Sequence, residues 1–365
     1  MEARMFLMPD YYPSFRCKGG QCRQCCCYGW RVTITMKDYF NLVGAECSPE
    51  LRRRLDIALH VLTDATEDRY AEIAHDWEGR CPMLRQDGLC MLHAECGEAM
   101  LPSTCRYHPR CVHTVIDDEC CCSCSCEAVV ELMLSRTEPL RMIRRYEAFD
   151  LPLVTRAVNN QHAVQACRVR DEMLALIQDR SKTIAERLMA AGEFGGEPEA
   201  SLQAKRGSHA AALFDASHTL RDARAITGKL LGGYAALEDI LRVSEANVGD
   251  DERKWRLARQ HFSKLVPHQE CFFENLLVNH LLYTGYPSFE RHETLKEAHL
   301  AMCACYIVLL YALVAGMAES SDEKLLVDRC TACFRIIEHA NFNQRAAALL
   351  NADADRITLR ALVAL

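Results

Sequence analysis

The sequence lacks a strong excess of either charge: its 365 residues carry a formal net charge of -7. The two signs are interspersed, so no basic surface indicates nucleic-acid binding. The first residues also lack the cationic stretch and apolar run of a secretory signal. Neither an internal repeat nor a low-complexity linker is visible. We therefore expect a globular, cytoplasmic protein that does not bind nucleic acid.

Cysteine, in contrast, is abundant and unevenly distributed. Of the 22 cysteines, sixteen lie at or before Cys126 and six are scattered over the rest of the chain. The cytosol keeps thiols reduced, so a dense cysteine pattern there favours metal binding or catalysis over disulfides. We predict a mainly α protein with two domains. A cysteine-rich, irregular, metal-binding lobe over residues 1–136 packs on a larger all-α helical domain over residues 137–365.

The spacing of the first cysteines is typical of a metal-binding loop. Cys17, Cys22 and Cys25 form a Cys-x4-Cys-x2-Cys pattern. This spacing occurs in ferredoxin-type iron–sulfur loops, but a zinc site with four thiolates uses the same residue types. A later run from Cys120 to Cys126 holds more thiols than one centre can use, and its alternate cysteines would point to one side of an extended segment. We expect the metal ligands to come from eight cysteines: Cys17, Cys22, Cys25, Cys26, Cys81, Cys90, Cys105 and Cys126.

Helical periodicity dominates the second half of the chain. Long apolar-periodic segments rich in Ala, Leu, Arg and Glu alternate there with short polar or Gly/Pro-rich breakers. Two more helices are expected before residue 136, over 49–74 and from 128 to 134. The later predicted helices cover 154–178, 184–191, 209–245, 253–266, 271–283, 294–318, 323–340 and 344–351.

One of these segments is long and apolar enough to cross a bilayer. Residues 300–318 carry no charge, and their length approaches the roughly 20 residues of a membrane span. No lysine or arginine cluster follows the segment to set its orientation. A helix that is apolar on all sides also suits the centre of a large helical domain. We expect a buried core helix, with a membrane span as the alternative.

The opening motif resembles that of a known family. Tyr11, Tyr12, Gly29 and Trp30 surround the first cysteines in a pattern similar to that of the flagellin lysine-N-methylases, which belong to a wider superfamily of cysteine-cluster zinc- or iron-chelating proteins. The family's last cysteine is usually followed by Pro, whereas Glu127 stands here. Later motifs that carry the resemblance are Cys81-Pro82, Gly88-Leu89-Cys90-x-Leu92-His93, Thr104-Cys105-Arg106-x-x-Pro109-Arg110 and Glu274-Asn275-x-Leu277-Val278-Asn279.

The resemblance implies an enzyme that transfers methyl groups from S-adenosylmethionine to lysines of flagellin and carries a [4Fe–4S] cluster, or zinc, in its cysteine lobe. Arg106 and Trp30 belong to the shared motifs and are expected to bind the cofactor. No glycine-rich loop after a strand and no βαβ pattern is visible. We therefore expect the methyl donor to bind to another architecture.

Methyl transfer to lysine needs a neutral amine, so the protein must remove a proton from the ammonium group. Glu274 is the predicted base, and Asn275 and Asn279 would orient substrate or cofactor one helical turn apart. Tyr11 and Tyr12 would shape the lysine entrance. The alternatives are a capping or surface role for Glu274 and a packing role for the two tyrosines.

Two other functions use the same cysteines. One is a non-catalytic module that binds zinc or iron or senses redox state. The other is a membrane-associated electron carrier, in which residues 300–318 span the bilayer.

Overall fold

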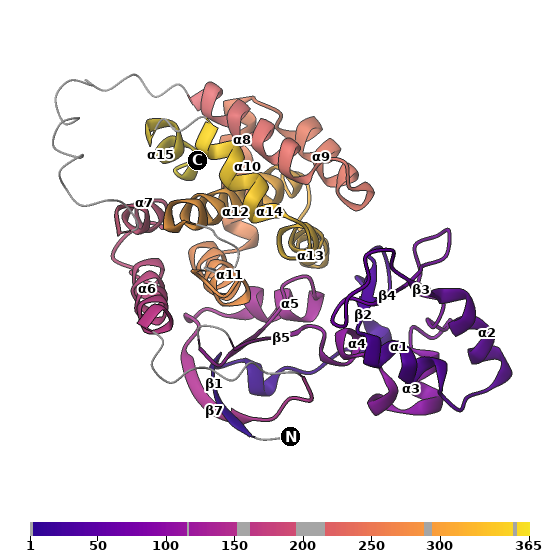
Figure 1. Ribbon diagram of the computed structural model, residues 1–365. Helices are drawn as coiled ribbons and strands as arrows, with labels where there is room; N and C mark the ends of the chain where they lie inside the picture. Colours follow the sequence, from indigo (N-terminus) through magenta and orange to yellow (C-terminus); the bar gives the residue numbers. More distant parts are fainter. Residues whose placement is uncertain (1–2, 115–116, 152–160, 195–215, 288–293, 353–355) are drawn as a thin grey trace.

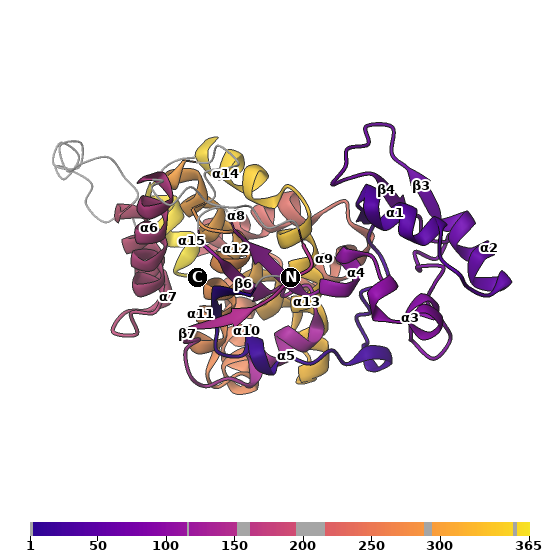
Figure 2. The same cartoon turned by 60° about the horizontal axis from the view of Figure 1, so that its bottom comes forward.

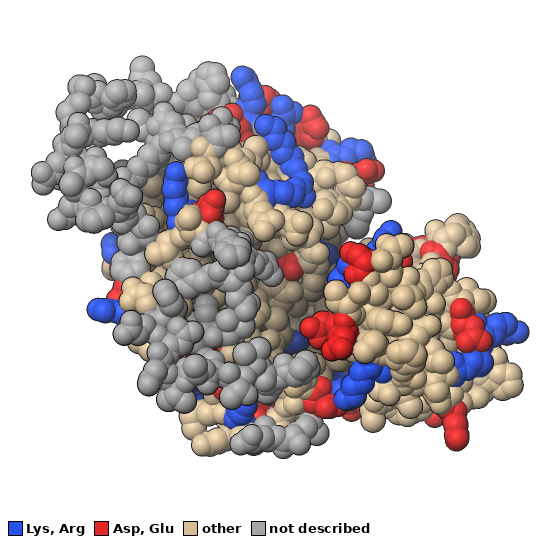
Figure 3. All heavy atoms as spheres, in the orientation of Figure 1, with Lys and Arg blue, Asp and Glu red and all other residues tan. Residues whose placement is uncertain are grey.

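The computed structural model describes residues 3–114, 117–151, 161–194, 216–287, 294–352 and 356–365. This part of the chain contains fifteen α-helices and seven short strands, which confirms a mainly α fold. Figure 1 shows a small lobe to one side of a larger helical body, and the turned view in Figure 2 agrees. Basic and acidic side chains are scattered over the face drawn in Figure 3, as the interspersed charges predict.

The lobe has its own hydrophobic core. Val32, Leu42, Leu51 and Leu55 lie in it together with Cys81. Its three-stranded sheet has the order β2-β4-β3, with β4 antiparallel to both neighbours. The elements of the lobe are β2 (Val32–Ile34), α1 (Met36–Val43), α2 (Pro49–Ala58), β3 (Leu59–Val61), β4 (Ala71–Ile73), α3 (Met91–Cys96) and α4 (Ser103–Tyr107).

A second sheet joins the start of the chain to the helical body. Its order is β5-β6-β1-β7, with β1 parallel to β6 and antiparallel to β7. All four residues of β6 are buried, so this cysteine-rich strand is part of the interior. The strand ends at Cys122, and Cys124 and Cys126 lie beyond it. The strands are β1 (Arg4–Pro9), β5 (Arg110–His113), β6 (Glu119–Cys122) and β7 (Met142–Glu147).

The helical body is built around α12 (Leu295–Gly316). Thr294 caps its start in a capping box with Glu297, which supplies partners for N–H groups of the first turn. This helix is long and apolar enough to cross a membrane, but its most apolar 18-residue stretch is wholly buried in the protein, as a core helix requires. Around it pack α7 (Ile184–Phe194), α8 (Ala216–Leu231), α9 (Ala235–Asn247), α10 (Glu252–Leu265), α11 (Gln269–Tyr283), α13 (Glu323–His339), α14 (Phe342–Ala352) and α15 (Arg356–Val363). Helix α5 (Glu127–Ser135) packs on α11 and α13, and α6 (Gln161–Ile177) packs on α7 and α11.

The hydrophobic cores divide the chain differently from the predicted boundary at residue 136. Phe6, Met8 and Phe15 belong to the core of the body, together with Cys122 and Val129. The lobe core draws instead on residues 32–92. The body therefore includes the beginning of the chain, and the cysteine-rich segments lie where the two parts meet. Residues 137–365 are helical in the described part apart from β7.

Several predicted helices have different limits. The helix predicted over 49–74 ends at Ala58, because the next residues pair as β3 with β4 and so satisfy their backbone groups across strands. The helix predicted over 209–245 is two helices, broken at Gly232 and Gly233, and Gly233 has a φ of 84°. Residues 154–160 and 209–215 lie outside the described residues. Helix α15 was not among the helices predicted from the sequence.

A close helix contact in the body gives a stability prediction. A Cβ atom on Gly192 of α7 would overlap Cε1 of His299 on α12, and the His299 ring is held with Nε2 at 2.8 Å from the Leu188 carbonyl oxygen. We expect Gly192→Ala to lower the free energy of unfolding by about 1–3 kcal/mol through overpacking. Gly228→Ala on α8, whose Cβ would meet no atom within 4 Å, should be neutral or stabilising. Urea unfolding measures both, and equal effects would contradict the prediction.

Candidate metal centre and the seam beside it

The first cysteine motif forms a tight loop, Cys17–Cys26, which we call the cysteine loop. It turns through the short 3-10 helix Gly19–Gln21. A Cβ atom on Gly20 would lie 2.5 Å from the Asp87 carbonyl oxygen, and one on Gly88 would lie 2.9 Å from Gly20 Cα. Only glycine allows this approach. It brings the cysteine loop against the turn that leads to Cys90.

The eight predicted ligand thiols gather in two groups. In the first, burial raises the pKa of Cys22 to about 12, and nearby Glu127, Cys126 and Cys17 add to the shift. In the second, burial raises the pKa of Cys81 to about 11, and the charges of Cys90 and Cys25 raise it further. Cys105 faces three of its members, Cys81, Cys26 and Cys90. All 22 cysteines are free thiols.

Several of these sulfur atoms accept hydrogen bonds from backbone N–H groups. The Gly19 N–H lies 3.3 Å from Cys17 Sγ, and the Cys27 N–H lies 3.4 Å from Cys25 Sγ. Cys81 and Cys126 are also bonded by N–H groups two or three residues further along the chain. Such bonds favour the thiolate, which is the form that binds metal. Hydrogen bonds from Cys26 and Cys27 also lower the pKa of Cys25.

The donor chemistry therefore fits a thiolate-bound metal or iron–sulfur cluster. Within the described ranges, no group of three or more cysteine, histidine or acidic side chains is close enough together to hold a metal ion. The eight cysteines consequently remain predicted ligands.

Glu127 fastens the cysteine loop to the body. It is the first residue of α5, and its side chain is fully buried. Its carboxylate accepts hydrogen bonds from Lys18 Nζ at 2.6 Å and from the Gln24 N–H at 2.5 Å, and Arg23 lies 3.8 Å away. Burial alone would raise the pKa of Glu127, but these bonds outweigh it and lower the pKa. The Glu127 carboxylate is thus a tether between the cysteine loop and the start of α5.

Helix α13 contacts the cysteine loop and the turn at residues 123–125. We call this contact the seam. The Arg335 guanidinium lies 5.2 Å from the centroid of the Trp30 ring and donates to the Cys25 carbonyl oxygen at 3.1 Å. Trp30 also makes edge contacts with His108 and His339, at centroid distances of 5.2 and 4.7 Å. Trp30, a predicted cofactor residue, is therefore placed beside the predicted metal ligands.

A chain of hydrogen bonds runs along the seam. Glu338 Oε2 accepts a 2.5 Å hydrogen bond from the Ser123 hydroxyl, which also contacts the Ser125 hydroxyl. Ser125 Oγ lies 2.9 Å from His339 Nε2, and the Tyr283 hydroxyl lies 3.5 Å from His339 Nδ1. Desolvation and then the charge of Arg335 lower the pKa of His339 to about 4. The imidazole is thus neutral at pH 7 and can both donate and accept.

The predicted catalytic residues Glu274 and Asn275 make structural contacts on α11. Glu274 is 1% exposed and forms ion pairs with Arg180 at 2.9 Å and Arg187 at 2.7 Å. Asn275 accepts from the Leu140 N–H at 3.0 Å. Both oxygens of the Glu274 carboxylate are therefore already engaged by guanidinium groups. The role of Glu274 as base stays a prediction without a supporting contact.

Tyr11 and Asn279 are brought together in a buried network. The Tyr11 hydroxyl donates to Asn279 Oδ1 at 2.5 Å and accepts from the Cys122 N–H at 3.1 Å. Asn279 Nδ2 donates to the Cys122 carbonyl oxygen at 2.8 Å. Burial raises the pKa of Tyr11 well above its usual value, so the phenol stays neutral. These contacts join the segment after β1 to the end of β6 and to α11.

The other predicted site residues lie elsewhere. Tyr12 is buried in the body core, and the Arg110 guanidinium lies 5.8 Å from the centroid of its ring. Arg106 forms an ion pair with Asp150 at 3.1 Å. No local spacing pattern connects α13 with the cysteine motifs, so the sequence alone did not predict the seam residues Ser123, Ser125, Arg335, Glu338 and His339.

The contacts of Glu127 with the cysteine loop give a second prediction. Glu127→Gln removes the charge that pairs with Lys18, so we expect a loss of about 1–3 kcal/mol in the free energy of unfolding and faster reaction of Cys22 with a thiol reagent. Glu131→Gln is the matched control, since Glu131 shares Lys18 but is 37% exposed, and should cost less than about 1 kcal/mol. Because the folded-state pKa of Glu127 is lowered, this attachment is present above the unfolded pKa and is lost as the pH falls. Equal thiol reactivity in the two variants would contradict the prediction.

The chain is similar to known proteins over part of its length. Lysine-N-methylases from Salmonella typhimurium and Salmonella choleraesuis are each 32% identical to it over 111 residues, which is 29% of this chain and 26% of theirs. A flagellar biosynthetic protein, FliU, from Salmonella muenchen is 29% identical over 110 residues, 29% of this chain and 62% of that protein. The match thus spans about a quarter of the length of the two methylases. No protein-family model and no solved structure matches the chain.

Proposed function

We propose that this protein is an S-adenosylmethionine-dependent lysine N-methyltransferase that modifies flagellin and carries an iron–sulfur cluster. The observation that carries the proposal is its 32% identity over 111 residues to two lysine-N-methylases. The name of the third relative, a flagellar biosynthetic protein, supports a flagellar substrate. A cytoplasmic location belongs to the same proposal, because a reducing compartment keeps the 22 cysteines as thiols.

The cluster would be held by cysteines from both thiol groups. Thiolates are the ligands of iron–sulfur clusters and of structural zinc, and the N–H bonds to Cys17 and Cys25 support thiolates in the cysteine loop. A bound cluster supplies a crosslink between the cysteine loop and the later cysteine motifs, and an iron centre for electron transfer or for binding the donor's amino-carboxylate.

Residues of the protein must accept the proton that the ammonium group of the substrate lysine loses. A free lysine has a pKa of about 10.4 and is almost wholly protonated at neutral pH. Methyl transfer needs the unprotonated amine, so the site has to desolvate the ammonium group and accept its proton. A carboxylate without a permanent cationic partner suits this task better than Glu274 with its two arginines.

The methyl-transfer activity can be measured directly. Incubation with S-adenosylmethionine and purified flagellin monomers should add single methyl masses to lysine-containing peptides, as seen by mass spectrometry. Flagellin whose lysines have been acetylated is the control and should gain none, because the amide nitrogen is not nucleophilic. Absence of any mass gain with cluster-loaded protein would instead favour the non-catalytic metal-binding or redox-sensing module.

The metal can be tested independently of activity. The purified protein should be brown, with a broad visible absorbance that dithionite bleaches. Cys22→Ser and Cys126→Ser should lower the bound iron at least about tenfold, since loss of even an outer partner of a metal site costs about 10–100-fold in affinity. Cys47→Ser, outside the predicted ligand set, should keep its iron. A colourless protein with stoichiometric zinc would overturn the cluster but leave the methyltransferase proposal to its own assay.

A further inference from the structure

A hollow of about 530 Å³ opens beside the seam, where α11 and α13 end and α14 begins. Tyr283, Thr284, Glu338 and His339 line it together with the amide side chains of Asn343 and Gln344 on α14. No sequence motif marked this place.

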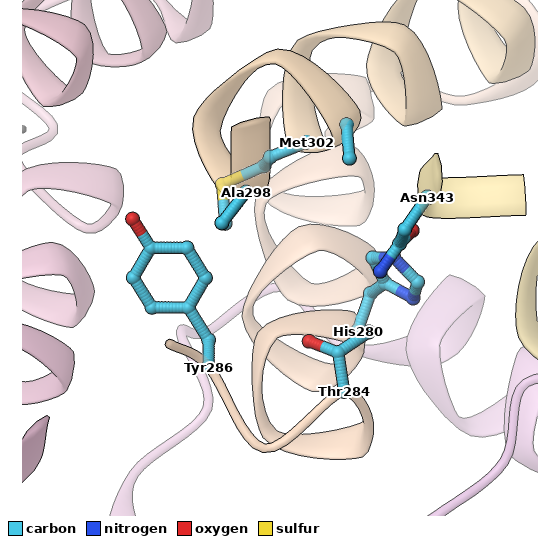
Figure 4. Close-up of a pocket in the computed structure, with 7 residues that line it drawn as sticks. His280, Thr284, Tyr286, Ala298, Met302 and Asn343 are labelled. Carbon is cyan, nitrogen blue, oxygen red and sulfur yellow. The ribbon is translucent and has the colours of Figure 1, made fainter. Parts of the chain in front are cut away.

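The hollow adjoins a smaller, more apolar pocket of about 10 Å³, with which it shares Thr284 and Asn343. Figure 4 shows Tyr286, Met302 and Ala298 around this pocket, opposite Asn343. Tyr286 is 4% exposed, and its hydroxyl, like Asn343 Oδ1, has no hydrogen-bond partner within the part of the chain described. Buried polar atoms of this kind are normally satisfied, and a space of about 10 Å³ is the size that a single water molecule fills.

The electrostatics of the hollow favour a cation. Glu338 supplies the one carboxylate of the lining, and no lysine or arginine is among the lining residues. His339 is neutral at pH 7 because desolvation and Arg335 lower its pKa. A ligand with its own carboxylate would find no counter-ion in this lining, whereas an alkylammonium group brought next to Glu338 would favour the ionised form of its carboxyl group.

We propose that this hollow receives the side chain of a substrate lysine and that Glu338 accepts the proton which its ammonium group loses. The inference rests on the proposed lysine methylation and deepens it, since it assigns the substrate site and the base. Glu338 is therefore a catalytic residue, whereas Ser123, Ser125 and His339 position it through the hydrogen-bond chain along the seam.

The step balances. The Glu338 carboxylate takes one proton from the ammonium group, which gives a carboxylic acid and a neutral amine. The amine nitrogen then forms a bond to the methyl carbon of S-adenosylmethionine, and the bond between that carbon and sulfur breaks. The electron pair of the broken bond stays on the sulfur of the released S-adenosylhomocysteine. The product is a methylammonium group.

The surroundings of Glu338 suit a base that works near neutral pH. Desolvation raises its pKa to about 8, against hydrogen bonds from Ser123 and from the N–H groups of Cys124 and Ser125, which lower it. A base is most effective when its pKa is close to the working pH. The other titratable groups that face it are Cys121, Cys124, Tyr283, Cys305, Cys330 and His339.

The test compares Glu338→Gln with the unchanged protein in methyl transfer to purified flagellin. We expect kcat/KM to fall at least about 100-fold, the lower end of what a positioned base contributes. In the unchanged protein the rate should rise with pH through about 8, the pKa of Glu338, because the ionised carboxylate is the active form. This inflection should disappear in Glu338→Gln and return in Glu338→Asp.

A second variant keeps the test informative if Glu338→Gln folds poorly. Gln344→Trp fills the mouth of the hollow from an exposed position and should lower flagellin methylation at least about tenfold. His60→Trp is the matched control, since His60 is exposed and lines a hollow of similar size, about 560 Å³, in the lobe. It should change the rate by less than about twofold. Binding of S-adenosylmethionine alone, measured by calorimetry, should stay within about twofold in all variants.

The outcomes are distinguishable. If the unchanged protein transfers no methyl group, the proposed function fails and this inference fails with it. If the unchanged protein is active and Glu338→Gln keeps its rate and its pH inflection, only the inference fails. If Gln344→Trp loses binding of S-adenosylmethionine, the hollow is the site of the methyl donor, and the assignment to lysine is overturned.

Discussion

The buried carboxylate of Glu127 is the constraint on which the candidate site depends. A carboxylate with no exposed surface must be paired, and the partners of Glu127 are Lys18, Arg23 and the backbone of Gln24. All three belong to the cysteine loop. Glu127 in turn begins α5, which packs against α11 and α13. One side chain therefore fixes the position of the first thiols relative to the helical body.

Helix α11 plays a similar role inside the body. It is buried along most of its length, yet it carries Glu274, Asn275 and Asn279. Glu274 ties down the arginines of α7 and of the segment before it, and Asn279 joins α11 to Tyr11 and to the end of β6. A buried polar group is tolerated only when its bonds are made. The contacts of this motif, which suggested catalysis, hold together segments that are far apart in the chain.

Features that depend on residues close together in the sequence could be predicted from it, whereas features that depend on contacts between distant residues could not. Periodicity located most helices of the body, because an apolar stripe is a local signal. It failed for residues 59–73, where three-residue strands pair across a turn, and for the parallel pairing of β1 with β6. The cysteine spacing predicted metal ligands because it is also a local signal. The bond from Ser125 to Glu338 joins residues 213 positions apart, and no pattern in a single sequence records such a contact.

One short turn, residues 123–126, carries both a predicted metal ligand and the groups that bind Glu338. Ser123 and Ser125 alternate with Cys124 and Cys126, and the N–H groups of Cys124 and Ser125 both point to Glu338. Cys126 belongs to the predicted ligand set, and its thiol is held by N–H groups at the start of α5. The position of the Cys126 thiol and the position of the Glu338 carboxylate are thus set by the same turn. The proposed cluster would therefore have a role that needs no redox step, because ligation at Cys126 would order the backbone that holds the proposed base.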